Sequence, residues 1–328
     1  MNEKIYKTLK SAETEDWLDY HVIRPICYYL TVMFARLGVH PNTVTVWSMV
    51  VGAASCLFFA HGCFYYEGTT GLVCNLIGIM LLMVADLLDC TDGQLARMTG
   101  KKSRMGRILD GIAGYTWYIP IYTALVVRFY MHHDLEFGWL GIADTPTNTL
   151  IATAVVLALA LWSGLAGIGP QQRLADYYIQ IHLFFLKGEK GSELDNSVRQ
   201  QEIYDEMKHN PEMSTVEKVF QKSYVEYTQK QEERTPQFQR LMRRLKEKYG
   251  SAGNMPAEVR KTLHDRSLKM IPWNSLLTFN FRTLSLVVFT LIDLPALNFL
   301  WEGFGMMLLA WCINRQHEKF CKEIADTL

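Results

Sequence analysis

Long apolar segments separated by short polar connections make up most of this chain. Six segments approach the roughly 20 residues that a helix needs to cross a bilayer. They cover residues 43–60, 71–88, 112–130, 149–168, 276–292 and 294–313. Residues 24–38 are apolar but shorter, and residues 187–270 are charged. The pattern predicts an all-α integral membrane protein with six transmembrane helices, an N-terminal interfacial helix and a cytoplasmic helical insert.

This pattern divides the chain into four parts. They are the cytoplasmic N-terminus with the interfacial helix (1–42), transmembrane helices one to four (43–186), the charged insert (187–270), and transmembrane helices five and six with a cytoplasmic tail (271–328). Residues 1–17 are too polar and too acidic for a cleaved signal peptide, so we expect the first apolar segment to stay in the mature protein.

Local signals predict where several helices begin and end. Pro25 suits the first position of the interfacial helix, and Gly38 suits its C-terminal cap. Asn42 or Thr43 is expected to be the N-cap of the first span.

The charged insert also has helical signals. Ser214 and Glu217 have the spacing of a capping box. One helical face is apolar, and it carries Phe238, Leu241, Met242, Leu245 and Tyr249. We interpret the insert as a helical subdomain for packing or oligomerisation.

Basic residues are sorted between the connections. Residues 61–70, residues 131–148 and the turn around Asp293 contain no Lys or Arg, whereas the other connections are basic. Because basic loops stay in the cytoplasm, both termini and the charged insert are predicted to be cytoplasmic. His132 and His133 fall in an outer loop, where we expect solvated surface positions.

Composition excludes several classes. The 33 Lys and Arg balance 33 Asp and Glu, which gives no support for nucleic-acid binding. The seven cysteines include no CxxC pair, and most lie inside apolar segments, so they form no disulfide or zinc framework.

Acidic residues gather at one end of two spans. Asp86, Asp89 and Asp92 lie at the end of the second apolar segment, and Asp110 lies just before the third. An ionised side chain near the hydrocarbon costs about 2.5–3.5 kcal/mol, and a divalent cation would compensate several at once. Carboxylate oxygens are ligands that Mg²⁺ and Mn²⁺ prefer. Because Asp89 and Asp92 share a helical face and the next span returns antiparallel, three carboxylates are expected to converge at the cytoplasmic surface.

The residues between these acids suit a phosphorylated ligand. Gly93 and Ala96 leave the backbone uncovered, Arg97 can pair with a phosphate, and Gly106 lets two helices pack closely. The alternative to a binding site is a helix end whose charged side chains only extend to the membrane–water interface. Each residue taken singly favours this alternative.

Together these residues match the pattern D-x2-D-G-x2-A-R-x8-G-x3-D of the CDP-alcohol phosphotransferase (phosphatidyltransferase) family, which the chain resembles. The matching positions are Asp89, Asp92, Gly93, Ala96, Arg97, Gly106 and Asp110. The segment "PNTVT", residues 41–45, is similar to a second motif of that family.

The resemblance implies a fold and a reaction. Six helices would surround a polar cavity open to the cytoplasm, where two divalent cations, Mg²⁺ or Mn²⁺, hold the pyrophosphate of a CDP-linked donor. An alcohol hydroxyl would then displace CMP. In this chain the implied metal ligands are Asp89, Asp92 and Asp110. The implied nucleotide-binding residues are Gly93, Ala96 and Arg97, with Asn42 and Thr45 beside them.

The chain departs from the family at one position. The family has a fourth aspartate, thought to deprotonate the acceptor, where this chain has Gly114. We hypothesise that Asp86 supplies the lost carboxylate from the neighbouring helix, as a metal ligand or as the general base. The alternative is that Asp86 only reaches the membrane interface. Asp110 and Asp86 are thus the predicted catalytic residues.

One further charge lies inside a span. Arg282 is about two turns into the fifth apolar segment, where an arginine usually faces a cavity and a partner. We expect it to bind a substrate phosphate. The alternative is a structural pair with a buried acid.

These features favour an enzyme of phospholipid synthesis, with the lipid bilayer, a CDP-linked donor and an alcohol acceptor as partners. The length of the membrane core favours CDP-diacylglycerol as donor. The segment "ARMTGKKSRMG", residues 96–106, is similar to a motif of choline and ethanolamine phosphotransferases and favours a CDP-aminoalcohol instead. A catalytically impaired scaffold, suggested by Gly114, is a third reading. A transporter is disfavoured because the acids lie at one membrane surface. A homodimer is left open.

Overall fold

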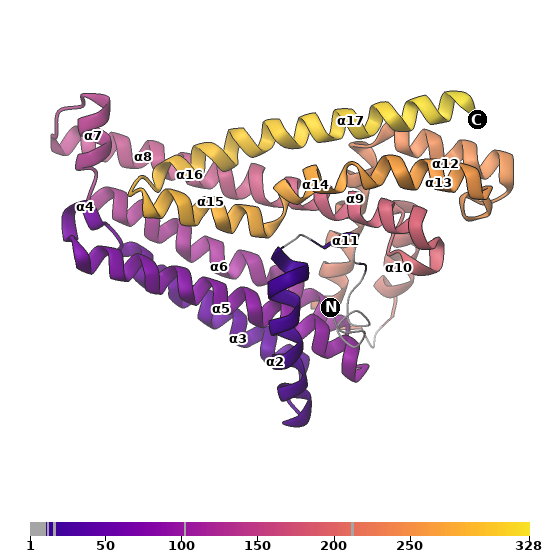
Figure 1. Cartoon of the computed structure of the whole chain (residues 1–328), viewed down its shortest axis with the longest axis horizontal. Helices are drawn as coiled ribbons and strands as arrows, with labels where there is room; N and C mark the ends of the chain where they lie inside the picture. The colour runs from indigo at the N-terminus through magenta and orange to yellow at the C-terminus, as the bar shows by residue number, and fades with distance from the viewer. Residues whose placement is uncertain (1–10, 12, 16–17, 102, 211–212) are drawn as a thin grey trace. The chain divides into compact units, whose positions relative to one another are not determined.

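A computed structural model describes residues 11, 13–15, 18–101, 103–210 and 213–328 (Figure 1). The sequence predicts that residues 1–17 are not a cleaved signal peptide. Most of these residues lie outside the described part of the chain. Every regular element in the described part is a helix, which confirms the all-α class. The chain divides into two compact units, one of residues 1–168 and 280–305, the other of residues 169–279 and 306–328.

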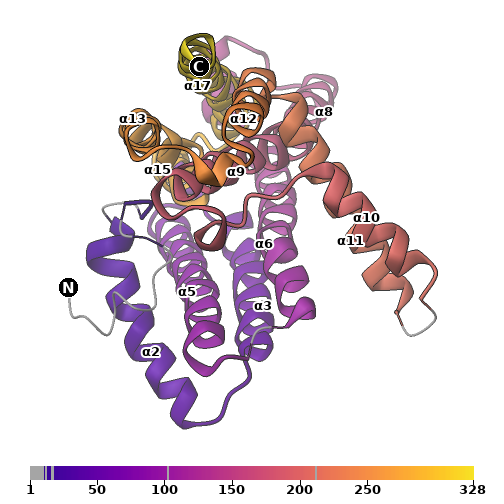
Figure 2. The same ribbon diagram turned by 90° about the vertical axis from the view of Figure 1, so that its right-hand side faces the viewer.

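The first unit contains three long helices that pack together. Helix α3 packs against both α5 and α6, and α2 packs against α5 (Figures 1 and 2). A side chain at Gly52 of α3 would lie 2.3 Å from the Trp117 ring of α6, so only glycine allows this close approach. The elements of this unit are η1 (Asp19–Ile23), α2 (Arg24–Arg36), α3 (Pro41–Ala60), α4 (Phe64–Glu67), α5 (Thr69–Thr99), α6 (Arg104–Met131), α7 (Asp134–Leu140), α8 (Pro146–Trp162), η2 (Ser163–Ile168), α15 (Phe279–Leu291), α16 (Ala296–Leu300) and η6 (Trp301–Gly305).

The second unit has its own apolar core. Phe238, Leu241 and Leu245 of α12 are buried in it, with Met242 and Tyr249 packed at its edge, so the predicted helical face is confirmed. The capping box of Ser214 and Glu217 is also present. The elements are α9 (Gly169–Lys187), η3 (Glu189–Gly191), α10 (Ser197–Lys208), α11 (Thr215–Glu233), α12 (Pro236–Tyr249), η4 (Ala252–Asn254), α13 (Ala257–Leu268), α14 (Ile271–Asn274), η5 (Ser275–Leu277) and α17 (Met306–Thr327).

Four helical segments are long and apolar enough to cross a membrane: Pro41–Ala60, Thr69–Thr99, Pro146–Lys187 and Ala296–Thr327. The third predicted span lies in α6, outside these four. The fifth lies in α15, whose 13 residues rise only about 20 Å, less than the roughly 30 Å of hydrocarbon. The count of six spans therefore stays a prediction.

The start of α3 corrects one expectation. Neither Asn42 nor Thr43 is the N-cap, because His40 has this position and its side chain accepts a hydrogen bond from the Asn42 backbone N–H at 3.2 Å. Pro41 explains the difference, since its fixed φ and missing N–H suit the first helical position and place the cap at the residue before it. The neighbouring α2 ends as expected, with Gly38 at φ 70°.

The connection that follows α6 is less solvated than expected. The imidazole Nε2 of His133 lies 3.2 Å from the Asp144 carboxylate, and its ring packs edge-on against Phe137. His132 lies 3.4 Å from the Glu67 carboxylate and is only partly exposed. The expectation of a solvated surface is therefore wrong for His133, which is buried, because a short helix, α7, supplies an apolar partner for its ring.

A buried ion pair and its hydrogen-bond partners connect α4, α5 and α6 with the residues that follow α3 and α15 in the first unit. Arg128 of α6 pairs with Asp293, which follows α15. Arg128 also donates to the Asn75 side chain on α5, and Asn75 donates to the carbonyl of Gly62, just after α3. Asp293 in turn accepts from the Tyr65 backbone N–H at 2.6 Å. Because both charges are hydrogen-bonded, burial leaves neither uncompensated.

Candidate active site

The motif of aspartates lies on one continuous helix. Helix α5 does not end with the apolar segment but continues to Thr99, and Gly100 at φ 68° forms its C-terminal cap. Asp89 and Asp92 are therefore one turn apart on the same face. Helix α5 thus presents these two carboxylates from a regular helix and not from a loop.

Thr45 links this helix to α3. Its hydroxyl donates a hydrogen bond to the carboxylate of Asp92, and both side chains are almost fully buried, at 2 % and 5 % exposure. A buried carboxylate requires such a donor, because an unpaired charge in this environment is strongly unfavourable. The "PNTVT" segment and the aspartate motif, far apart in sequence, therefore meet directly.

Asn42 provides a second link, from α3 to α6. Its Oδ1 lies 3.4 Å from the hydroxyl of Ser103, the N-cap of α6, which accepts from the Gly106 N–H at 2.9 Å. A Cβ at Gly106 would lie 2.9 Å from the Asn42 Oδ1. Glycine at this position therefore allows the start of α6 to approach α3.

Asp110 lies one turn after Gly106 and is exposed on α6. Its charge is close enough to those of Asp89 and Asp92 to interact with both. The Oδ1 atom of Asp89 is buried and has no hydrogen-bond partner within the described residues. The oxygens of Asp89, Asp92 and Asp110 are not all within 4.8 Å of one another in the described part of the chain. The acids are thus neighbours, but they form no single tight cluster.

Arg97 folds back along α5. Its guanidinium lies over Gly93, where an added Cβ would be 3.4 Å from a terminal nitrogen. Ala96, beside it, is half-buried. The small residues Gly93 and Ala96 therefore leave room for the arginine above the helix backbone.

Asp86 lies one turn before Asp89. Its charged neighbours are Asp19 of η1 and Arg24 of α2, and it also interacts with Tyr118 of α6. Because positions 110, 114 and 118 are each one turn apart, Gly114 lies on the same face of α6, between Asp110 and Tyr118. Asp86 thus interacts with the residue one turn beyond Gly114, while α5 and α6 both pack mainly against α3.

Arg282 lies in a different environment from the aspartates. It is buried and its NH1 lies 3.0 Å from the Glu302 carboxylate. Glu302 also accepts from the hydroxyls of Tyr122 and Ser163 and from the amide of Asn298. Arg282 thus forms the structural ion pair with a buried acid that was the alternative to a phosphate contact. A contact between Arg282 and a phosphate stays an untested expectation.

The structure adds residues that sequence analysis missed. Ser103 precedes Gly106 by three residues, which is an N-cap signal that the sequence does contain. Arg24 and Glu15 form an ion pair of 2.8 Å beside α5. Nothing in their spacing indicates this contact, because it depends on how α2 packs.

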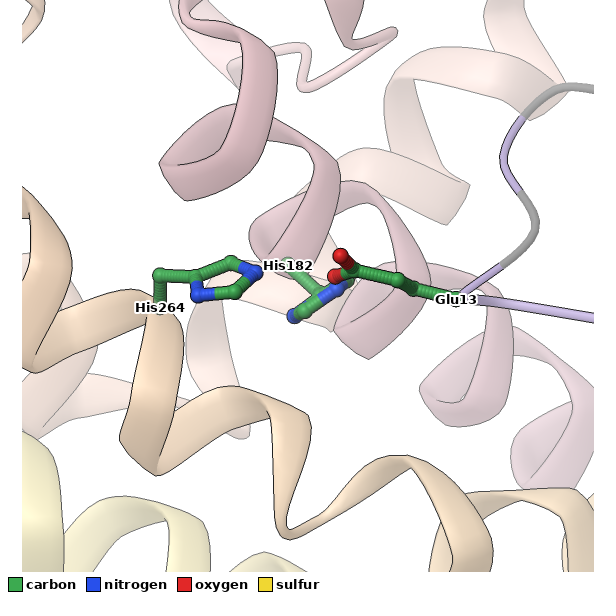
Figure 3. A group of neighbouring side chains, drawn as sticks. All are labelled: Glu13, His182 and His264. Carbon is green, nitrogen blue, oxygen red and sulfur yellow. The ribbon is translucent and has the colours of Figure 1, made fainter.

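Two groups of the second unit carry atoms that bind metals in other proteins. His317, Glu318 and Cys321 lie together on α17. Glu318, however, accepts hydrogen bonds from the backbone N–H groups of Gln237 and Phe238 at the start of α12, which explains its position as a helix cap. The rings of His182 and His264 are 5.1 Å apart (Figure 3), and His182 Nδ1 lies 2.8 Å from the Ser267 hydroxyl.

Comparison with known protein families gives a match over the part of the chain that contains these residues. Residues 38–175 match the family model described as CDP-alcohol phosphatidyltransferase. No curated protein and no solved structure matches the chain. The matched range includes Asn42, Thr45 and the aspartates of α5 and α6. The four apolar helices and this match together indicate an integral membrane protein. Residues 38–175 are therefore similar to the CDP-alcohol phosphatidyltransferase family, whose members are enzymes that transfer substituted phosphate groups.

Proposed function

We propose that this enzyme transfers a phosphatidyl group from CDP-diacylglycerol to the hydroxyl of a polar alcohol, releases CMP, and depends on Mg²⁺ or Mn²⁺. One observation carries the proposal. The buried Asp89 oxygen, which has no partner among the residues that the structure describes, lies among the charges of Asp110, Asp92 and Asp86. Several carboxylates close together near the membrane are unfavourable unless a bound cation compensates their charge.

The residues present fit a divalent cation. Asp89, Asp92 and Asp110 would hold it, because ionised carboxylates are hard oxygen ligands. Ligands of two different ions need not touch, so the spacing of these three carboxylates would be compatible with a pair of ions. When bound, the metal neutralises charge on the donor pyrophosphate and on the leaving CMP.

The other residues of the site would position the donor and the acceptor. Thr45 fixes the orientation of Asp92 through its hydrogen bond. Arg97, held above Gly93, would donate to a phosphate oxygen of the donor. Asp86 would take the proton of the acceptor hydroxyl, in place of the aspartate that is absent at Gly114.

The direction of the reaction has one alternative. The similarity of residues 96–106 to choline and ethanolamine phosphotransferases supports a CDP-aminoalcohol donor and a lipid alcohol acceptor. Both reactions break the same pyrophosphate bond and release CMP, so the carboxylates and Arg97 would have the same roles. The two differ in which substrate carries the acyl chains.

A single assay separates these possibilities. The purified protein is incubated with Mg²⁺, with either CDP-diacylglycerol or CDP-ethanolamine, and with a panel of alcohols, while CMP is measured. We expect release with CDP-diacylglycerol and one class of polar alcohol. Release only with CDP-ethanolamine and a lipid alcohol would reverse the direction. No release with any pair would contradict the proposal and favour a scaffold.

A further inference from the structure

Helix α2 is fixed against the motif-bearing part of α5 by polar contacts. The Cys27 thiol and the Thr31 hydroxyl lie 3.4 Å from the carbonyls of Leu87 and Thr91, respectively. In the opposite direction, the Gln94 amide donates to the carbonyl of Arg24 at 3.4 Å. The first residue of α2 is therefore held at a defined position beside the aspartates.

The guanidinium of Arg24 points at α5. Its NH1 lies 3.1 Å from the Cys90 thiol, and its Nε lies 2.8 Å from the Glu15 carboxylate. Cys90, Gly93 and Arg97 follow one another at helical spacing on one face of α5. Because Arg97 folds back over Gly93, the two guanidinium groups approach each other from opposite ends of this face.

Two cations placed so close repel each other unless an anion lies with them. The Arg24 and Arg97 charges do interact, and Glu15 interacts with both. The Glu15 side chain is only 7 % exposed, although it belongs to the polar segment before α2. An exposed salt bridge would contribute little, but the Glu15 partner of this pair is buried. The burial of the Glu15 carboxylate beside Arg24 and Arg97 indicates a site that binds an anion.

We infer that Arg24 and Arg97 together bind a phosphate group of the CDP-linked donor, and that the carboxylate of Glu15 takes the place of this phosphate when no donor is bound. The inference rests on the proposed function, which it deepens by adding a second phosphate-binding arginine. An arginine binds one phosphate through two parallel N–H donors, so a second arginine adds another such pair of donors for the pyrophosphate of the donor. Glu15 then acts as a competitor that the donor must displace.

The alternative is that the pair of Arg24 and Glu15 only anchors the chain before α2. The two ideas predict different directions for the change in CDP binding. An anchor is weakened by loss of either partner, so both single variants would act in the same direction. A competing anion gives opposite effects, because loss of Arg24 removes a donor contact whereas loss of Glu15 removes the competitor.

The test measures binding of CDP to the full-length protein in lipid nanodiscs, with Mg²⁺ present, by isothermal titration calorimetry. We expect Arg24→Gln to weaken CDP binding about 10- to 100-fold, as for loss of a charge-assisted hydrogen bond. Glu15→Gln should strengthen it several-fold. Arg36→Gln is the matched control, because Arg36 is an exposed arginine at the other end of α2.

Each outcome is decisive. Opposite shifts for Arg24→Gln and Glu15→Gln support the inference, and shifts in the same direction, or Kd values equal to that of Arg36→Gln, overturn it. If Arg24→Gln does not fold, Arg24→Lys keeps the charge without the planar fork and should still weaken binding; unchanged binding by this variant would overturn the inference. Absence of CDP binding by the wild type would overturn the proposed function itself, and the inference with it.

Discussion

At the scale of single residues, the candidate site depends on side chains that lie outside the aspartate motif. Thr45 donates to Asp92, and Asn42 lies against Ser103 and Gly106. Both residues come from the first two turns of α3. The "PNTVT" segment thus acts by fixing the carboxylate-bearing helices, in addition to any contact that it makes with a substrate.

Gly106 gives the sharpest test of this packing. A methyl group there would lie 2.9 Å from the Asn42 Oδ1 and 3.0 Å from the Ser103 hydroxyl, so α6 or Asn42 must shift. We expect Gly106→Ala to reduce CMP release at least about 10-fold, because small displacements of positioning groups are costly to catalysis. Gly111→Ala is the control, since nothing lies within 4 Å of a Cβ at this position on the same helix. Equal activities of the two variants would contradict this account of Gly106.

At the scale of elements, α5 and α6 decide whether Asp86 can replace the missing aspartate at Gly114. The electrostatic interaction of Asp86 with Tyr118, one turn beyond Gly114, supports this hypothesis. We therefore expect Asp86→Asn to lower CMP release by two orders of magnitude or more. Gly114→Asp added to Asp86→Asn should restore part of the activity. If Asp86→Asn stays within a few-fold of the wild type, the acceptor must be activated by another group.

A second element-scale prediction concerns α15 and η6. Because Arg282 and Glu302 are a buried ion pair, removal of one partner should destabilise the protein by about 3–5 kcal/mol. Arg282→Met and Glu302→Gln should both lower the thermal unfolding temperature in detergent, with little change in the KM for the donor. The double variant should lose less than the sum of the two. A variant Arg282→Met with normal thermal stability and a strongly raised KM would instead indicate a phosphate contact.

Sequence reasoning predicted features that local chemistry decides. The capping box at Ser214 and the apolar face around Leu241 are examples, since both depend on residues within two turns. The end of the helix that contains the second span was predicted less well. Apolar composition indicates only the part of a helix that is buried in lipid, and α5 continues beyond that part through polar residues to Thr99. Sequence reasoning left the partner of Arg282 open, because Glu302 lies 20 residues away and only tertiary packing brings the two together.

At the scale of the whole molecule, the unequal distribution of basic residues predicts the topology. Cysteines introduced at Asp144 and at Lys230, in a background without the seven native cysteines, should differ in labelling by an impermeant thiol reagent in intact cells. We expect labelling at Asp144 alone, because the connection of residues 131–148 contains no Lys or Arg. Labelling of the Lys230 variant from outside would contradict the predicted cytoplasmic location of the insert.

The central claim is that the carboxylates on α5 and α6 bind the metal that supports transfer. The most direct measurement is Mg²⁺-dependent CMP release by the wild type and by Asp89→Asn, which changes the buried oxygen that has no partner among the described residues. Asp134→Asn, an exposed acid at the start of α7, is the matched control. We predict that Asp89→Asn and chelation each remove nearly all activity, while Asp134→Asn keeps it. An Asp89→Asn protein with more than about a tenth of the wild-type turnover, a barrier change below about 1.4 kcal/mol, would contradict the claim.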